Sequence, residues 1–274
     1  MTDPPEPKSS FDDPIREETA HREHPAGSED DRPILFVGDV QGCAHELALL
    51  LEEAGFVPGS HRLIPLGDLV NRGPDAPGVL ELLRETRAEP ILGNHERGLL
   101  DIMRTGRVHP WARRPEYAYS QLLAAGRWER EMASIARWPL FRVGTDSAGQ
   151  GWVAVHAGLH PTLTPEETPA QFLTEVRFCD ANGNEPENQS KRETHPPPGF
   201  LPWFDHYGGD RMVLFGHWAP LGLVRGRRVR GLDTGCVYGR QLSGLWWPDD
   251  RLVQVNAARL YYPIRNPTNT PSRT

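Results

Sequence analysis

A series of short polar clusters runs along this chain, and each cluster stands at the end of an apolar run. The runs are short and rich in branched residues, as β-strands are, and they span residues 34–37, 63–66, 90–92, 153–155 and 212–215. The clusters that follow them are Gly38–Gly42, Gly67–Gly73, Gly93–Glu96 and the single residues His156 and His217. Because α/β proteins place their functional sites where strands end, the sequence predicts one site assembled from distant parts of the chain.

The residue types in these clusters indicate a site for two metal ions. Hydrolysis of a phosphate ester at neutral pH needs a hydroxide and a neutraliser for the phosphoryl oxygens, and two metal ions about 3.5–4 Å apart supply both. Carboxylates, amide oxygens and neutral imidazoles are suitable ligands for such ions. Six residues carry these groups: Asp39 and Gln41 for the first ion, Asp68 bridging both ions, and Asn94, His156 and His217 for the second.

Two further residues have side chains suited to the reaction itself. His95 directly follows the ligand Asn94, which leaves its imidazole free to act as a general acid toward the leaving oxygen. Arg72 has a planar guanidinium that can hold a phosphate at two points. Taken singly, a Gly-Asp pair after a strand is usually a turn, and a histidine in an apolar strand usually packs in the core. The order of the clusters is what favours a catalytic site.

In these motifs the chain resembles the calcineurin-like metallophosphoesterases, and most of all the bacterial symmetrically cleaving bis(5'-nucleosyl)-tetraphosphatases. The similarity covers roughly residues 33 to 256 and includes the segments 38–43, 177–179, 202–204, 215–219 and 232–236. The resemblance implies a metallo-dependent phosphatase fold of the α/β class, with two mixed β-sheets packed face to face, flanking helices and a small helical cap. It also implies hydrolysis of diadenosine tetraphosphate to two ADP by a metal-bridging hydroxide, with Arg177 as a second phosphate contact.

Two departures from the family pattern affect the expected chemistry. Gln41 stands where the wider family carries His, and its amide oxygen favours Mn²⁺ as the cofactor, with Mg²⁺, Co²⁺ or Fe/Zn as the other candidates. Asn71 stands where related protein phosphatases carry an Asp that orients the catalytic histidine. Without that charge, Asn71 is expected to accept a hydrogen bond from His95 but to stabilise the imidazolium less.

Other features leave alternatives open for the substrate. The segment between His156 and Arg177 is shorter than in the tetraphosphatases, and Gly93–Glu96 is more like the corresponding motif of a protein phosphatase. A protein serine/threonine phosphatase of the same fold is therefore the alternative, followed by a non-catalytic binding module. The basic segment Arg225–Arg230 either contacts the distal phosphates of a substrate or forms a solvated turn, and charge runs of this kind are more often solvated.

Composition agrees with a soluble enzyme, and the resemblance implies a small-molecule nucleotide as its substrate. A net charge of −7 argues against a general nucleic-acid binder, since affinity for a polyanion depends on basic side chains. The three cysteines, Cys43, Cys179 and Cys236, form no paired spacing and are expected to be buried thiols, which favours a reducing, cytoplasmic location. No apolar run is long enough for a membrane span or a signal peptide.

The chain is expected to divide into a disordered tail at 1–32, a phosphoesterase domain at 33–262 and a loose C-terminal tail at 263–274. Helices are predicted at 44–54 and 79–87, between the first strands, which implies parallel strand pairing at the start of the sheet. Segment 97–138 is predicted to form a helical cap, and 180–200 a polar loop. From residue 221, short β-like runs predict an antiparallel second sheet.

Overall fold

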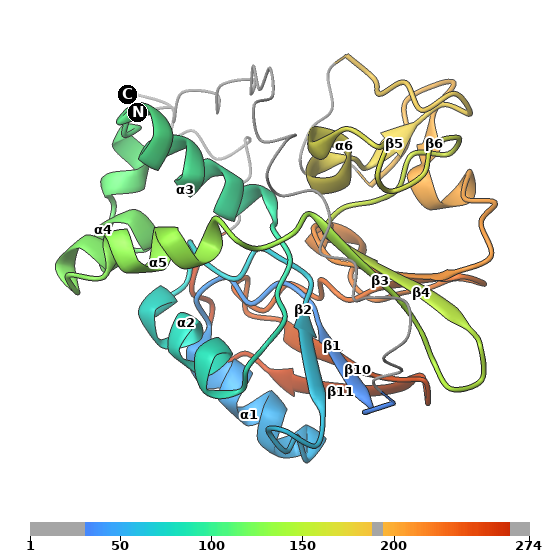
Figure 1. Cartoon of the computed structure of the whole chain (residues 1–274). Helices are drawn as coiled ribbons and strands as arrows, with labels where there is room; N and C mark the ends of the chain where they lie inside the picture. The colour runs from blue at the N-terminus through green and yellow to red at the C-terminus, as the bar shows by residue number, and fades with distance from the viewer. Residues whose placement is uncertain (1–30, 188–193, 264–274) are drawn as a thin grey trace, which may run out of the picture.

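A computed structural model describes residues 31–187 and 194–263 (Figure 1). The predicted tails therefore lie outside the described residues, except for 31–32 and 263, as does part of the predicted loop at 180–200. The strands form a four-stranded sheet in the order β11-β10-β1-β2, a five-stranded sheet in the order β3-β4-β7-β9-β8, and a small pair, β5-β6. Both larger sheets contain parallel and antiparallel pairs, so the predicted fold class of two mixed sheets with flanking helices is confirmed.

The strands run from residue to residue as follows: β1 Ile34–Val37, β2 Arg62–Pro65, β3 Phe141–Thr145, β4 Gly151–Val155, β5 Phe178–Cys179, β6 Leu201–Pro202, β7 Met212–Phe215, β8 Val224–Arg225, β9 Val229–Gly231, β10 Gln241–Trp247 and β11 Arg251–Asn256. The α-helices are α1 Ala44–Ala54, α2 Ala76–Glu85, α3 Asn94–Thr105, α4 Ala118–Ala124, α5 Trp128–Ile135 and α6 Ala170–Glu175. Three short 3₁₀ turns complete the described elements: η1 Pro110–Arg113, η2 Trp203–Asp205 and η3 Ala219–Leu221. Within these residues, no helix is both long enough and apolar enough to cross a bilayer.

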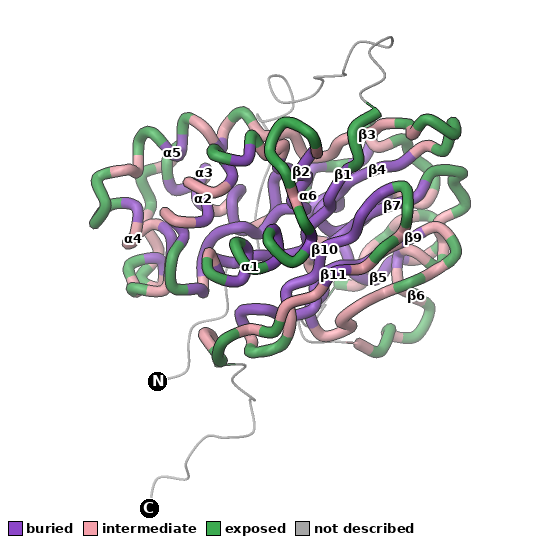
Figure 2. The backbone as a smooth tube through the Cα atoms, turned by 90° about the horizontal axis from the view of Figure 1, so that it is seen from below, coloured by how far each residue is buried: buried purple, intermediate pink, exposed green. Residues whose placement is uncertain are grey.

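The first strand shows how the layers are built. All four of its residues are buried, and successive side chains point to opposite faces of the sheet. Leu35 and Val37 belong to the apolar cluster that includes the buried side of α1 and α2, whereas Ile34 and Phe36 pack with residues of the five-stranded sheet, among them Trp152. Each buried apolar side chain of this kind contributes about 1.5–3 kcal/mol to folding. The result is a sheet-on-sheet core with helices outside, and Figure 2 shows buried residues concentrated along the central strands.

The helices near the start of the sheet follow from local signals. Helix α1 occupies its predicted range and ends at Gly55, which adopts the left-handed conformation typical of helix ends. Helix α2 begins earlier than predicted, at Ala76, because the Asp75 carboxylate caps it by accepting a hydrogen bond from the Gly78 N–H. Strands β1 and β2 are parallel, as the strand–helix–strand order predicts.

The predicted strand at 90–92 is wrong. Residues 89–92 run beside β2, and the N–H groups of Glu89 and Ile91 donate to the Leu63 and Pro65 carbonyls, but no strand forms. In a parallel ladder the return hydrogen bond to the Glu89 carbonyl would come from residue 65, and Pro65 has no N–H to donate. The Arg142 guanidinium donates to that carbonyl instead, at 2.9 Å.

The antiparallel second sheet predicted from residue 221 is also wrong in its arrangement. Strands β10 and β11 join β1 and β2 in the four-stranded sheet, while β8 and β9 complete the edge of the five-stranded sheet. Both hairpins are antiparallel, but β9 pairs in parallel with β7. Local sequence indicated the strands, whereas their division between two sheets depends on contacts with distant parts of the chain.

Segment 97–138 contains most of α3 together with α4 and α5, which lie together beside α2 (Figure 1). The buried residues Leu122, Met132 and Ile135 join the apolar cluster that also contains the buried face of α1. Its predicted role as a cap over the site stays a prediction.

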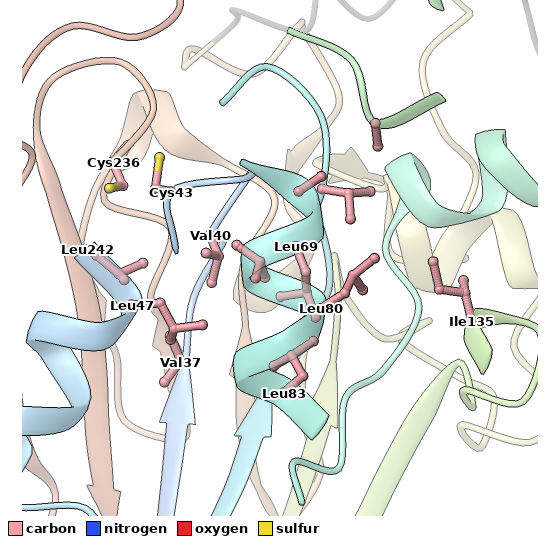
Figure 3. Packing of buried hydrophobic residues seen from close by; sticks show 14 of the residues in the cluster. Val37, Val40, Cys43, Leu47, Leu69, Leu80, Leu83, Ile135, Cys236 and Leu242 are labelled. Atoms are coloured by element: carbon pink, nitrogen blue, oxygen red, sulfur yellow. The ribbon is translucent and has the colours of Figure 1, made fainter. Parts of the chain in front are cut away.

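The three cysteines are buried and free, as expected of small apolar residues in a core. Figure 3 shows Cys43 and Cys236 close to one another among Val40, Leu47 and Leu242.

Candidate metal centre

Apart from Arg177, the predicted site residues lie near the carboxyl ends of neighbouring parallel strands in both sheets. Strands β1 and β2 are parallel neighbours in one sheet, and β4 and β7 are parallel neighbours in the other. The side chains come from the segments that directly follow these strands and from the start of α3: Asp39 and Gln41 after β1, Asp68 and Arg72 after β2, Asn94 and His95 in α3, His156 after β4, and His217 after β7. The expected placement at strand ends therefore holds after β1, β2, β4 and β7, whereas Asn94 and His95 begin α3 after a segment that forms no strand.

The backbone of these loops is held in an uncommon conformation. Of the seven non-glycine residues with positive φ in the described chain, five lie here: Gln41 at 47°, Asp68 at 49°, Asn71 at 71°, Arg72 at 65° and His217 at 69°. Side chains larger than glycine rarely adopt this left-handed region, and such residues cluster at functional sites.

Glycines let the loops approach one another closely. A Cβ on Gly93 would collide with the backbone nitrogen and the carboxylate of Asp68, and a Cβ on Gly216 would collide with the Asp39 carboxylate. The glycine before Asn94 and the glycine before His217 therefore each leave room for an acidic side chain from another loop.

The two histidines face each other with their acceptor nitrogens. His156 Nδ1 lies 2.8 Å from the Leu66 carbonyl oxygen, and His217 Nε2 lies 3.1 Å from the Glu175 carbonyl oxygen. A carbonyl only accepts hydrogen bonds, so these ring nitrogens are the donors, and in neutral rings the other nitrogens carry lone pairs. Those two nitrogens, His156 Nε2 and His217 Nδ1, are 3.2 Å apart.

Further oxygen atoms converge on the same point. The Asn94 Oδ1 atom lies 3.1 Å from both inward-facing imidazole nitrogens, and the Asp68 Oδ1 atom lies 3.3 Å from His156 Nε2. Asp68, His156 and His217 place one ligand atom each within 4.8 Å of one another. Four groups that present lone pairs to one small space repel each other, and a bound cation would turn that repulsion into attraction.

The carboxylate and amide assigned to the first ion are also buried and incompletely paired. Asp39 Oδ1 accepts a hydrogen bond from the His217 N–H at 2.9 Å, but Asp39 Oδ2 and Gln41 Oε1 have no hydrogen-bond partner among the described residues. The Gln41 N–H donates to the Asp68 carbonyl, which ties the two loops together. Buried polar atoms without partners are rare, so these two oxygens fit a site that holds metal. The structure therefore contains a candidate metal site with the predicted residue types, and the identity of the metal is a separate question.

Three buried carboxyl groups of the site have raised pKa values. Burial raises the pKa of Asp39 well above its ordinary value, and the charges of Asp233 and Asp68 raise it further. Burial raises the pKa of Asp233 to about 6, with Asp68 adding to the effect. Burial and the Asp68 charge likewise raise the pKa of Glu96 to about 8. Several buried carboxyl groups this close together favour a bound cation, which would lower all three pKa values.

His95 lies where a general acid would need to be. It is the second residue of α3 and is 8% exposed. Its Nδ1 donates to the Val70 carbonyl at 2.9 Å, and its Nε2 lies 3.6 Å from Asp68 Oδ2. The backbone of Val70 thus orients the ring and leaves Nε2 directed at the site.

The expected hydrogen bond between Asn71 and His95 is wrong. Asn71 Oδ1 instead accepts a hydrogen bond from the Ala118 N–H at 2.9 Å, at the start of α4. The carbonyl of the preceding residue, Val70, takes the orienting role that was expected of the Asn71 side chain. A neutral carbonyl still fixes the tautomer of His95.

The two candidate phosphate-binding arginines differ in their surroundings. Arg72 Nη1 donates to the Tyr238 hydroxyl at 2.9 Å, and its guanidinium lies over the Tyr262 ring at 5.8 Å. Arg177 is 8% exposed, and its Nε has no hydrogen-bond partner among the described residues. Burial lowers the pKa of Arg177 to about 10, against the opposing charge of Glu175. A buried guanidinium nitrogen without an acceptor is suited to an anionic ligand.

Arg225 and Arg230, at the two ends of the basic segment Arg225–Arg230, form ion pairs within the fold. Arg225 Nη2 contacts Asp250 Oδ2 at 2.6 Å, and Arg230 Nε contacts Asp250 Oδ1 at 2.7 Å. Asp250 lies at the turn between β10 and β11, so the arginines join two hairpins. These contacts support the interpretation of the segment as a surface turn.

Sequence reasoning assigned no role to three residues that build the site. Glu96 is fully buried and accepts hydrogen bonds from the N–H groups of Gly93, Asp68 and Leu69, so it fixes the loop that carries Asp68. Asp233 adds a carboxylate beside Asp39, and Tyr238 holds Arg72. Glu96 stood at the end of a recognised motif, where its spacing after Gly93 is that of a helix capping box. Asp233 lies in segment 232–236, which carries the family resemblance, but no role was predicted for it, and Tyr238 carried no local signal of its own.

Comparisons with known proteins agree with this geometry. A family model described as calcineurin-like phosphoesterase matches residues 32–221. A protein of Aromatoleum aromaticum named bis(5'-nucleosyl)-tetraphosphatase, symmetrical, is 30% identical over 274 residues, covering 82% of this chain and 97% of that protein. A protein of the same name from an Acidovorax species is 33% identical over 260 residues, covering 77% of this chain and 91% of that protein.

A solved structure of a protein proposed to be a diadenosine tetraphosphatase is also similar. Its TM-score is 0.66 at 28% sequence identity, and the match covers 83% of this chain and 95% of that one. The match thus covers a larger share of the chain than the family model does.

Proposed function

The chain belongs to the calcineurin-like phosphoesterase family, and from this premise we propose that it hydrolyses dinucleoside polyphosphates, cleaving diadenosine tetraphosphate at its centre into two ADP. The observation that carries the proposal is the convergence of Asp68, Asn94, His156 and His217 on one point, with His95 at the start of α3 and Arg72 on the loop after β2. The names of relatives that align over most of the chain support the substrate class. The family is metal-dependent, and chemistry at this site is phosphoester or phosphoanhydride hydrolysis.

The residues fit two divalent cations, and we propose Mn²⁺ as the preferred ion. Six side chains would hold them: Asp39 and Gln41 on one side, Asp68 between, and Asn94, His156 and His217 on the other. When bound, such ions lower the pKa of a water molecule and neutralise the charge on the phosphoryl oxygens. Most of these ligands are carboxylate or amide oxygens, which suit Mn²⁺ and Mg²⁺, and only His156 and His217 are imidazoles.

The side chains around the ions have separate tasks. Arg72, fixed by Tyr238 and Tyr262, would bind the phosphoryl oxygens at the scissile centre. Arg177 would bind a neighbouring phosphate of the chain. His95 would hold a proton on Nε2 and deliver it to the leaving oxygen, since Nδ1 is committed to the Val70 carbonyl. The proton matters most when the leaving group is a strong base.

The product pattern from diadenosine tetraphosphate tests the proposed substrate. We expect two ADP as the main products, and a higher kcat/KM for the dinucleotide than for a simple aryl phosphate, because remote binding energy can be used at the reacting centre. The measurement is chromatography of the nucleotides released in the presence of Mn²⁺. ATP plus AMP as main products would contradict central cleavage.

The same preparation should be tested on a phosphoserine or phosphothreonine peptide. A clear preference for the peptide would favour the protein serine/threonine phosphatase and would remove the dinucleotide as substrate, while leaving the metal chemistry in place.

Metal content and preference test the cofactor proposal. We expect two divalent ions per chain under saturating Mn²⁺ and a higher activity with Mn²⁺ than with Zn²⁺, because Gln41 offers an amide oxygen in place of an imidazole. Replacing Gln41 with His should shift the preference toward Zn²⁺. Elemental analysis that finds a single tightly held ion in the fully active protein would contradict the two-ion assignment.

A further inference from the structure

A pocket of about 300 Å³ lies beside Arg72. Its lining comes from the loop after β2, from the turn before α4 and from the segment after β11, namely Arg72, Gly73, Pro74, Glu116, Arg259, Leu260 and Tyr261. The volume is at the lower end of the range for pockets that bind small molecules. Among its lining residues, only Arg72 has a proposed role in the reaction.

The segment after β11 is fixed in place by its own hydrogen bonds. The Tyr261 hydroxyl donates to Glu46 Oε1 at 2.7 Å, and the Ala258 N–H donates to the same oxygen at 2.9 Å. The N–H groups of Tyr261 and Tyr262 both donate to the Val237 carbonyl. These bonds join the segment to α1 and to the loop before β10, so the pocket is already formed without a ligand.

Arg72 connects the pocket to the metal centre. Its guanidinium is held by the Tyr238 hydroxyl and lies over the Tyr262 ring, while Arg72 itself lies four residues after Asp68 on the same loop. A phosphate chain whose scissile group is bound at Arg72 would continue into this pocket. The segment 257–263 lies beyond residue 221, where the match to the family model ends, so the pocket is built partly from residues outside that shared region.

The lining suits a nucleotide. Arg259 is exposed, and its guanidinium lies over the Tyr261 ring at 5.1 Å, which adds a positive charge to a pocket that already contains Arg72. Leu260 is 56% exposed, and with Pro74 it gives the pocket an apolar wall that a base could cover. The Glu116 carboxylate is paired with Arg114 through one oxygen, and its other oxygen can accept a hydrogen bond, as carboxylates do from ribose hydroxyls in nucleotide sites.

We propose that this pocket binds the part of the dinucleoside polyphosphate that lies beyond the scissile phosphorus, with Arg259 on a distal phosphate and Leu260 against the nucleoside. The inference rests on the proposed function, since it names the subsite for one half of that substrate. Arg259 is then a specificity-determining residue: it favours substrates with a distal phosphate and nucleoside over simple phosphate esters.

The variant Arg259→Gln tests this assignment. We expect kcat/KM for diadenosine tetraphosphate to fall about tenfold, mostly through a higher KM, because one charge-assisted contact to phosphate is lost. The kcat/KM for an aryl phosphate, which does not reach the pocket, should stay unchanged. Steady-state kinetics with Mn²⁺ gives, for each of the two substrates, the ratio of the variant's kcat/KM to that of the wild type.

Arg251→Gln is the matched control. Arg251 is also exposed and also lies over an aromatic ring, that of Trp246 at 5.7 Å, but it stands at the opposite end of β11 from the pocket segment. Its replacement removes the same charge from the protein and should change neither ratio. An equal effect of both variants would show a general electrostatic effect and would overturn the assignment.

The outcomes separate this inference from the proposed function. If the wild-type chain forms two ADP and Arg259→Gln does so with unchanged kcat/KM, the subsite is refuted and the function stands. The subsite is likewise refuted if the variant loses activity equally on both substrates. If the wild-type chain leaves diadenosine tetraphosphate intact, the proposed function fails and the subsite fails with it.

Discussion

Replacing Asp68 with Asn is expected to lower kcat by about 10³-fold or more, on aryl phosphate and dinucleotide alike. The Asp68 carboxylate accepts a hydrogen bond from the His95 N–H at 2.9 Å and lies 3.3 Å from His156 Nε2. Asparagine keeps the shape and one acceptor oxygen, but it removes the negative charge and turns an N–H₂ group toward the place where a cation would bind. We therefore expect a folded protein with reduced metal content.

The measurement combines kcat at saturating Mn²⁺ with elemental analysis of the same sample. Asp249→Asn, in the exposed turn between β10 and β11, is the control for loss of one carboxylate and should behave as wild type. An Asp68→Asn protein that keeps both ions and most of its activity would remove Asp68 from the centre of the site.

Replacing His95 with Ala is expected to lower kcat by about 10²–10⁴-fold while metal content stays nearly unchanged. The imidazole Nε2 faces the site, at 3.6 Å from Asp68 Oδ2, but it is not one of the nitrogens that converge on Asn94. The variant therefore loses a proton donor and retains the proposed ligands.

The leaving group provides the decisive comparison for His95. An aryl phosphate with a weakly basic leaving oxygen needs little protonation, so the deficit of His95→Ala should shrink on that substrate and be largest on a poor leaving group. An equal loss on both would mean that His95 positions the substrate and does not transfer the proton.

The sequence alone was sufficient to predict the fold class and the strand ends that carry the site. Strands such as β1 and β7 are continuous apolar runs with polar residues directly after them, and both signals are local. The ligand residues could also be predicted from local sequence, because Asp68, Asn94 and His156 each follow an apolar run. The distances between these ligand side chains could not be predicted, because they depend on how the two sheets pack.

The wrong predictions, and the site residues for which no role was predicted, involve interactions between residues that are distant in the sequence. The place of β10 between β1 and β11 follows from a pairing across about two hundred residues, which no local pattern encodes. Asp233 reaches the site because its loop packs against Gly38, where a Cβ would collide with the Leu232 carbonyl. Asn71 had a partner predicted from family chemistry, but the Ala118 N–H donates to its side-chain oxygen instead.

The left-handed backbone at Gln41, Asp68 and His217 has a consequence for how this protein can change over evolutionary time. Glycine suits such a conformation best, and each larger residue there costs on the order of 1 kcal/mol. Yet glycine at these three positions would remove a side chain that faces the site. Selection for thermostability alone would thus tend to erase the activity, while selection for activity retains a less stable loop. Descendants that have lost the reaction should show glycine at these positions first.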